Sequence, residues 1–186
     1  MKPIILASAS PRRRELLTQI GIVFTVITAD IDETPLPSED PISYTLRLAD
    51  AKARAVLMQH PNAIVIGADT IVTADEQLLG KPRDAADAER MLHLLQGRKH
   101  QVTTGIAVLT RDQTHTVAET TDVTFAAMDQ ATIRDYIATG EPMDKAGAYA
   151  IQGIAVQWIP RIEGDYSNVV GLPLARLAEM LQRVQR

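Results

Sequence analysis

The stretch from residue 4 to residue 16 constrains the fold of this chain more than any other. It begins with an apolar run at residues 4–7, which is typical of a buried strand. Ser10 then stands where a helix N-cap is expected, and Pro11 stands at the first helical position, where its missing N–H costs no hydrogen bond. An apolar stripe and a terminal glycine mark the rest of the predicted helix: Leu16, Leu17, Ile20 and Gly21. The sequence therefore predicts a strand, a tight serine loop and a helix in direct succession.

Three arginines occupy the first turn of this predicted helix. Arg12 and Arg13 lie one turn before the apolar stripe and lean toward the core, whereas Arg14 shares its face with Thr18 and is expected to meet water. Guanidinium groups beside a helix N-terminus suit the bidentate binding of phosphate. The alternative is a solvated basic turn, but positive charge at this end opposes the helix dipole. We therefore favour a phosphate site.

Composition limits the classes of protein to which the chain can belong. With 186 residues, 46% of them hydrophobic and 23% charged, the sequence fits a globular protein with a substantial core. We expect one domain with two lobes over residues 1–186. The chain has no cysteine, so disulfides and thiol-bound metals are excluded. A net charge of −4 argues against a broad nucleic-acid surface. No apolar run resembles a signal peptide or a membrane span, so we expect a cytoplasmic protein without nucleic-acid or membrane partners.

An acidic loop and a lysine are candidates for a functional site in the first half of the chain. Asp30, Asp32 and Glu33 could bind a hard divalent cation, although acidic residues in a loop are often simply solvated. Asp40-Pro41 then predicts a helix that runs to about residue 59. On this helix Lys52 borders the apolar stripe, so it either extends to water or points into a cleft.

A carboxylate interrupts the next apolar segment. Residues 64–66 predict a buried strand, residues 67–70 interrupt it, and the apolar pattern resumes through residue 72. Asp69 lies inside this segment, where a carboxylate must be hydrogen-bonded, bind a cation or line a cleft. Lys81 follows the predicted hairpin between Gly80 and Pro82, which fix its backbone; it either contacts phosphate or is an exposed turn lysine.

The second half of the chain predicts a β-hairpin, several helices and one loop suited to a ligand. The predicted elements are helices over residues 85–96 and 129–139, a hairpin over 100–110 and 114–128, a strand over 154–162, and a last helix with Pro173 at its first position. Small residues dominate residues 140–153 and would let the backbone approach a ligand closely. Gln152 could read a base edge through its amide, although a lone glutamine is more often a surface residue.

Five short blocks of this sequence resemble the signature blocks of the Maf family, also called septum formation proteins. They are Ser8-Ala-Ser-Pro-Arg-Arg, Gly67-Ala-Asp-Thr, Gly80-Lys-Pro, Asp144-Lys-Ala-Gly-Ala-Tyr with Ile151-Gln-Gly, and Asn168-Val-Val-Gly-Leu-Pro. The blocks occur in family order and span nearly the whole chain. The resemblance implies an elongated α/β fold with a mixed sheet and a cleft between two lobes, similar to inosine triphosphate pyrophosphatase. One departure is Ala150, where the resemblance leads us to expect glycine.

The resemblance also implies an activity and a set of site residues. Members of the family are nucleotide pyrophosphatases that hydrolyse a nucleoside triphosphate to the monophosphate and pyrophosphate with a divalent metal, Mg²⁺ or Mn²⁺. Asp69 matches the proton acceptor of the family. The specificity positions are matched by Arg12, Thr70 and Gln152, a set that resembles the dTTP/UTP branch and not the 7-methyl-GTP branch. The other polar cleft positions are matched by Ser8, Arg13, Glu33, Lys52 and Lys81.

Our hypothesis for the mechanism is that Asp69, together with Glu33, positions a water molecule directly or through the metal, which both carboxylates would bind. Modified pyrimidine nucleotides are a further class of substrate that the sequence does not separate from dTTP and UTP. The resemblance suggests a homodimer. The alternative function is a nucleotide-binding regulatory protein that acts in cell division without significant turnover.

Overall fold

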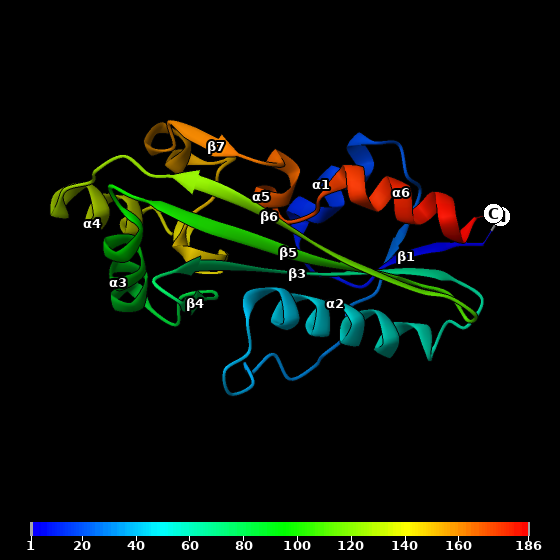
Figure 1. Cartoon of the computed structure of the whole chain (residues 1–186). Coiled ribbons are helices and arrows are strands. Elements are labelled where there is room, and N and C mark those ends of the chain that lie inside the picture. Colours follow the sequence, from blue (N-terminus) through cyan, green and yellow to red (C-terminus); the bar gives the residue numbers. More distant parts are fainter. Residues whose placement is uncertain (1, 186) are drawn as a thin grey trace. The chain divides into compact units, whose positions relative to one another are not determined.

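The computed structural model describes residues 2–185 and has a mixed α/β architecture (Figure 1). The described strands form one seven-stranded sheet in the order β2-β1-β3-β5-β6-β7, with β4 paired to β3. The strands are β1 (Ile4–Leu6), β2 (Thr25–Val26), β3 (Ile64–Ala74), β4 (Gln77–Leu79), β5 (Lys99–Leu109), β6 (Thr114–Thr124) and β7 (Arg161–Glu163). Parallel pairs (β1 with β2 and β3) coexist with antiparallel pairs (β3 with β4, β6 with β7), so the predicted mixed α/β fold class is confirmed.

Helices and short 3₁₀ turns connect the strands. The α-helices are α1 (Pro11–Gln19), α2 (Pro41–Leu57), α3 (Ala85–Leu95), α4 (Gln130–Ala138), α5 (Tyr166–Val170) and α6 (Leu174–Val184). The 3₁₀ turns are η1 (Glu141–Asp144), η2 (Ala146–Ala148) and η3 (Ile154–Trp158). No helix within residues 2–185 combines the length and apolar character that crossing a bilayer requires.

The chain divides into two compact units. The first comprises Met1–Asp69, Thr104–Glu119 and Gly171–Arg186, and the second comprises Thr70–Thr103 and Thr120–Val170. Strands β3, β5 and β6 each contribute residues to both units. The predicted single domain with a cleft between two lobes stays a prediction.

The first unit places helices on both sides of its strands. Figure 1 shows α2 on one side of β1 and β3, with α1 and α6 on the other. Side chains of α2, of β1, β3 and β5, and of the residues next to β1 and β3 form its apolar core: Ile5, Ala7, Ala49, Ala53, Val56, Ala63, Val65, Ala107 and Leu109. The register that supports this core aligns Ile5 with Val65 and Leu6 with Ile66. Helix α2 therefore packs directly on β3, the strand that carries Asp69.

Local capping signals explain where most helices begin. Asp40 accepts hydrogen bonds from the backbone N–H groups of Ile42 and Ser43, both at 3.0 Å, so α2 starts as predicted. Helix α1 begins at Pro11 with Ser10 at its N-cap position, although the Ser10 side chain makes no cap hydrogen bond. Its apolar stripe is shorter than predicted, because Ile20 follows the last helical residue and is 40% exposed.

Three predicted elements were wrong. Residues 67–70 do not interrupt a strand, because β3 runs without a break through Asp69. The predicted strand over 154–162 is mostly the turn η3, whose first N–H groups bond to the distant carboxylate of Glu141, and only residues 161–163 are extended. Pro173 lies at the N-cap position of the last helix and not at its first helical position, and a separate short helix, α5, ends three residues before it.

The second unit has its own core, to which α3, α4, β4 and η2 contribute. Within it, Gly147 has a positive φ of 68°, and a Cβ there would lie 2.8 Å from a Val72 methyl group, so only glycine fits. Ala148 also has a positive φ, 61°, whereas Ala150 is not among the residues with positive φ. The backbone at position 150 therefore does not require the glycine that the resemblance led us to expect.

Candidate active site

Three charged side chains of the first unit meet at one point. The Nζ atom of Lys52 lies 2.6 Å from Oδ1 of Asp69 and 2.7 Å from Oε1 of Glu33. The side chains of Lys52 and Asp69 are only 12% and 11% exposed, whereas that of Glu33 is 52% exposed. The open question about Lys52 is thereby answered, because it points to the two carboxylates and not to open solvent. We refer to Glu33, Lys52 and Asp69 as the acid–lysine cluster.

Close packing between α2 and β3 brings the cluster together. Side chains two residues apart on a strand share a face, so Asp69 projects to the same side as Gly67. A Cβ at Gly67 would lie 2.1 Å from the backbone oxygen of Ala49, which shows how closely the strand approaches α2. Lys52 lies one turn after Ala49 on the same helix. The missing side chain at position 67 thus lets Lys52 reach Asp69.

The charge state of Asp69 reflects opposing influences. Burial raises the pKa of this carboxyl above its ordinary value, and the negative charge of Glu33 acts in the same direction. The positive charges of Lys52 and Arg13 oppose the increase. The result is a carboxylate that is more basic than an exposed aspartate but still ion-paired, which suits a group that accepts a proton from water.

Arg13 is buried and hydrogen-bonds to three other segments of the first unit, a role that the sequence did not predict. Its guanidinium donates to the backbone oxygens of Gly171 at 2.7 Å and Ala68 at 2.9 Å, and to Oγ of Ser8 at 3.0 Å. Burial lowers the pKa of Arg13, and the nearby charge of Arg12 lowers it further. Arg13 therefore connects the loop after β1 to the segment before α6 and to β3. Its contact on β3 is Ala68, the residue before Asp69.

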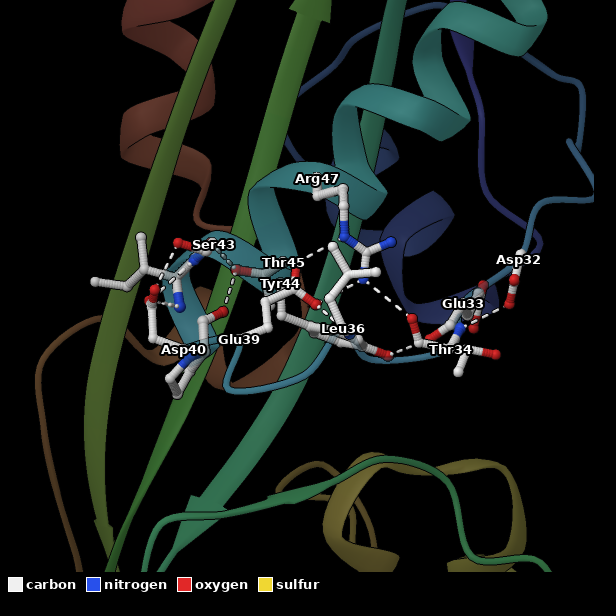
Figure 2. A network of polar contacts seen from close by, with 12 residues as sticks. Asp32, Glu33, Thr34, Leu36, Glu39, Asp40, Ser43, Tyr44, Thr45 and Arg47 are labelled. Carbon is white, nitrogen blue, oxygen red and sulfur yellow. Dashed lines mark hydrogen bonds and ion pairs between the residues drawn. The ribbon is translucent and has the colours of Figure 1, made fainter.

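Glu33 reaches the cluster from a loop between β2 and α2. The phenol of Tyr44 donates to the backbone oxygen of Glu33 at 3.1 Å (Figure 2). Burial raises the pKa of Tyr44 to about 12, and the charges of Asp69 and Glu33 add to the effect, so the phenol stays protonated and able to donate. Asp32 instead accepts from the N–H of Thr34 at 2.9 Å, and Asp30 is exposed. Of the three acidic loop candidates, only Glu33 joins the cluster.

The other predicted substrate contacts fall into two groups. In the first unit, Ser8 is buried and bonded to Arg13, while Arg12 is half-buried and close enough to influence Arg13 electrostatically. The remaining three, Thr70, Lys81 and Gln152, belong to the second unit. Thr70 is half-buried, and Lys81 and Gln152 are exposed. Their roles stay predictions.

The donor set of the cluster fits a hard divalent cation. Carboxylate oxygens of Glu33 and Asp69 both contact Nζ of Lys52, and Mg²⁺ usually takes one or two protein carboxylates and completes its shell with water and phosphate oxygens. Residues 2–185 contain no group of three or more acidic or histidine side chains that could hold a metal alone. Glu33 and Asp69 are therefore the residues that could hold a metal together with a phosphate ligand, and the Lys52 ammonium group occupies the point that they share.

Sequence reasoning missed Tyr44, which supports the cluster from α2. A signal was present, because Tyr44, Leu48 and Lys52 recur at intervals of four residues and so share one face of the helix. This spacing indicates that Tyr44 lies near the residues that Lys52 contacts, although the sequence analysis did not use it.

Replacing Lys52 with methionine should move the pH dependence of any reaction that needs ionised Asp69. Lys52 lowers the pKa of Asp69, so its loss raises that pKa further, and activity should then fall at a higher pH as the solution is acidified. We expect the acid limb of kcat/KM to shift upward by about one pH unit. Lys52→Arg, which keeps the charge, is the control. An acid limb at the same pH in Lys52→Met and wild type would contradict this assignment.

Comparison with known proteins gives a family and several relatives. The model of the family described as Maf-like protein matches residues 3–184. A dTTP/UTP pyrophosphatase of Koribacter versatilis is 54% identical over 97% of this chain and 93% of the relative. Relatives with the same name in Symbiobacterium thermophilum and Bacillus cytotoxicus are 53% and 48% identical, over 97% and 98% of this chain and 93% and 96% of their own lengths. Among solved structures, the Ham1 protein of Staphylococcus aureus aligns with a TM-score of 0.47 and 19% identity, over 79% of this chain and 85% of that one.

Proposed function

Since the chain belongs to the Maf-like protein family, we propose that it is a pyrophosphatase that hydrolyses dTTP and UTP to the monophosphate and pyrophosphate. Relatives about half identical to it over nearly their whole length carry that name, which supports the substrate class. The observation that carries the proposal is the buried, paired carboxylate of Asp69 in the acid–lysine cluster. Modified pyrimidine nucleotides belong to the same proposed class.

Positive charge in the first unit supports triphosphate binding. Arg12 lies in the first turn of α1, where the helix dipole favours an anion. Lys52 adds an ammonium group inside the cluster, and Arg13, in the first turn of α1, donates to the Ser8 hydroxyl in the loop that precedes the helix. We assign phosphate binding to these residues, and a phosphate contact of Lys81 stays a prediction from the sequence.

In the proposed reaction a water oxygen attacks the α-phosphorus, and the bond from that phosphorus to the bridging oxygen breaks. Pyrophosphate leaves with the electrons of this bond, and Asp69 accepts a proton from the water. The raised pKa of Asp69 improves it as a base, and Lys52 keeps it ionised. Mg²⁺ or Mn²⁺, held by Glu33 and Asp69, would supply charge neutralisation at the phosphates.

A turnover assay separates the enzyme from the regulatory alternative. Pyrophosphate release is measured with dTTP, UTP and GTP in Mg²⁺ or Mn²⁺ and then after EDTA, while nucleotide binding is measured by calorimetry. We expect rapid release from the pyrimidine nucleotides that EDTA abolishes. Tight binding with negligible release in either metal would instead favour a nucleotide-binding regulator.

Substrate preference should depend on the two proposed base-reading residues, Thr70 and Gln152. Gln152→Ala and Thr70→Ala should each lower the ratio of kcat/KM for dTTP over GTP by about tenfold or more, because a site that hydrogen-bonds a base rejects one without matching groups. The total activity should change less than this ratio. Gln157→Ala, which changes another exposed glutamine of the second unit, is the control. An unchanged ratio in both site variants would remove these residues from base recognition.

Dimer formation, a cytoplasmic location and the absence of nucleic-acid partners stay predictions from the sequence. Size measurement in solution by light scattering tests the first of them directly.

A further inference from the structure

We propose that Arg47 is a positioning residue that, with Glu39 and Tyr44, holds the loop before α2 so that Glu33 stays at the acid–lysine cluster. The inference rests on the proposed function for its effect on turnover, but the holding of the loop is independent of it. All of the residues involved lie in the first unit.

The loop that carries Glu33 has no apolar core to hold it. Every residue from 32 to 38 is exposed, and Leu36, the large apolar side chain among them, is 54% exposed. Ser38 also has a positive φ of 58°, which is unfavourable for a side-chain-bearing residue. Polar contacts to α2 must therefore supply most of the order of this loop.

Arg47 makes the central contact of this polar network. Its Nε lies 2.6 Å from Oε1 of Glu39 and its second terminal nitrogen lies 2.7 Å from Oε2, which is a bidentate pair (Figure 2). The Glu39 side chain is 6% exposed and that of Arg47 is 31% exposed, so this pair is partly shielded from solvent. The same guanidinium also donates to the backbone oxygen of Thr34 at 3.2 Å.

Two further contacts complete the attachment of the loop. Oε2 of Glu39 accepts from the backbone N–H of Leu36 at 3.0 Å, and the Tyr44 phenol donates to the backbone oxygen of Glu33. The Arg47 guanidinium carbon lies 5.6 Å from the centre of the Tyr44 ring, so the two side chains support each other.

These contacts fix the backbone directly around Glu33. Tyr44 binds the carbonyl of Glu33 and Arg47 binds that of Thr34, the next residue, so two successive peptide groups are attached to α2. Lys52 extends from the same helix. The helix therefore sets both ends of the Glu33–Lys52 contact, and the Glu33 carboxylate does not have to be recruited from a mobile loop at each turnover.

The test combines Arg47→Gln with Glu33→Gln. We expect Arg47→Gln to lower kcat with dTTP about tenfold in the wild-type background but less than about twofold in the Glu33→Gln background, because residues that act through one another are not additive. Hydrogen exchange of the metal-free protein should show faster exchange over residues 30–38. Arg47→Lys keeps the charge but loses the bidentate pair. It should lower kcat and speed exchange over residues 30–38 to a smaller extent.

Arg54→Gln is the matched control, because Arg54 lies on the same helix and pairs with Asp50 at 2.6 Å without touching the loop. It should leave both kcat and exchange over residues 30–38 unchanged. An equal loss of kcat from Arg47→Gln in both backgrounds, or unchanged exchange in the loop, would overturn the inference. Absence of turnover in the wild-type protein would refute the proposed function instead, and loop exchange would then decide alone whether Arg47 holds the loop.

Discussion

Asp69→Asn is expected to lower kcat with dTTP by about two to four orders of magnitude, the usual range for removal of a general base. Asparagine has nearly the same shape but cannot accept the proton of the attacking water. The variant should stay folded, because folding raises the pKa of Asp69 and its ionised form is therefore a cost to the native state at neutral pH. Lys52 also keeps Glu33 as a partner. Steady-state kinetics and thermal unfolding measure the two effects.

Asp87→Asn is the matched control for this prediction. Asp87 and Asp69 are both 7% exposed, but their pKa values shift in opposite directions. Burial acts to raise the pKa of Asp87, but hydrogen bonds from the backbone and side chain of Arg83 and from Arg90 outweigh it and lower the pKa overall. Its replacement should reduce stability and leave kcat within about threefold. Near-wild-type kcat in folded Asp69→Asn would refute the role of Asp69.

Arg13→Gln is expected to reduce the free energy of unfolding by about 3–5 kcal/mol, because it leaves several buried acceptors unsatisfied at a cost of about 1–3 kcal/mol each. The substitution leaves the backbone oxygens of Gly171 and Ala68 and the Ser8 hydroxyl without their common donor. Denaturant unfolding of the nucleotide-free protein measures this loss without reference to catalysis. The unfolding temperature should fall by roughly 10 °C.

Arg14→Gln provides the comparison from the neighbouring position. Arg14 is exposed on the outer face of α1, so its replacement should change the free energy of unfolding by no more than about 0.5 kcal/mol. If the two variants were equally stable, the buried bonds of Arg13 would contribute little to the fold, and a role restricted to phosphate binding would remain for it.

Local sequence signals predicted the starts of α2, α3 and α4 to within one residue. Asp40, Asp84 and Asp129 each accept a hydrogen bond from a backbone N–H in the first turn of the helix that follows. Such a bond joins residues two or three apart in sequence, so it is visible in a short pattern. The glycine after α1 likewise takes the positive φ expected of a helix end.

Two of the three wrong predictions, the break in β3 and the strand over residues 154–162, share a dependence on distant partners. Residues 154 and 155 form a turn because their N–H groups bond to Glu141, which lies more than ten positions earlier in the sequence. Strand β3 continues through Asp69 because Lys52, seventeen positions away, satisfies the buried carboxylate. In both cases a long-range polar contact stabilises a backbone conformation that local propensity does not favour.

Short motifs along the chain were enough to identify the family, the mixed α/β class and the candidates Glu33 and Lys52, and the cost of burying charge added Asp69. The contacts of Lys52 with the two carboxylates and of Arg13 with backbone oxygens became clear from the folded chain alone. The reason is that both contacts depend on how closely α2, β3 and the segment at Gly171 pack. The distance between α2 and β3 is set at Gly67, where the missing side chain lets the strand approach the helix. No local sequence pattern indicates how short this distance is.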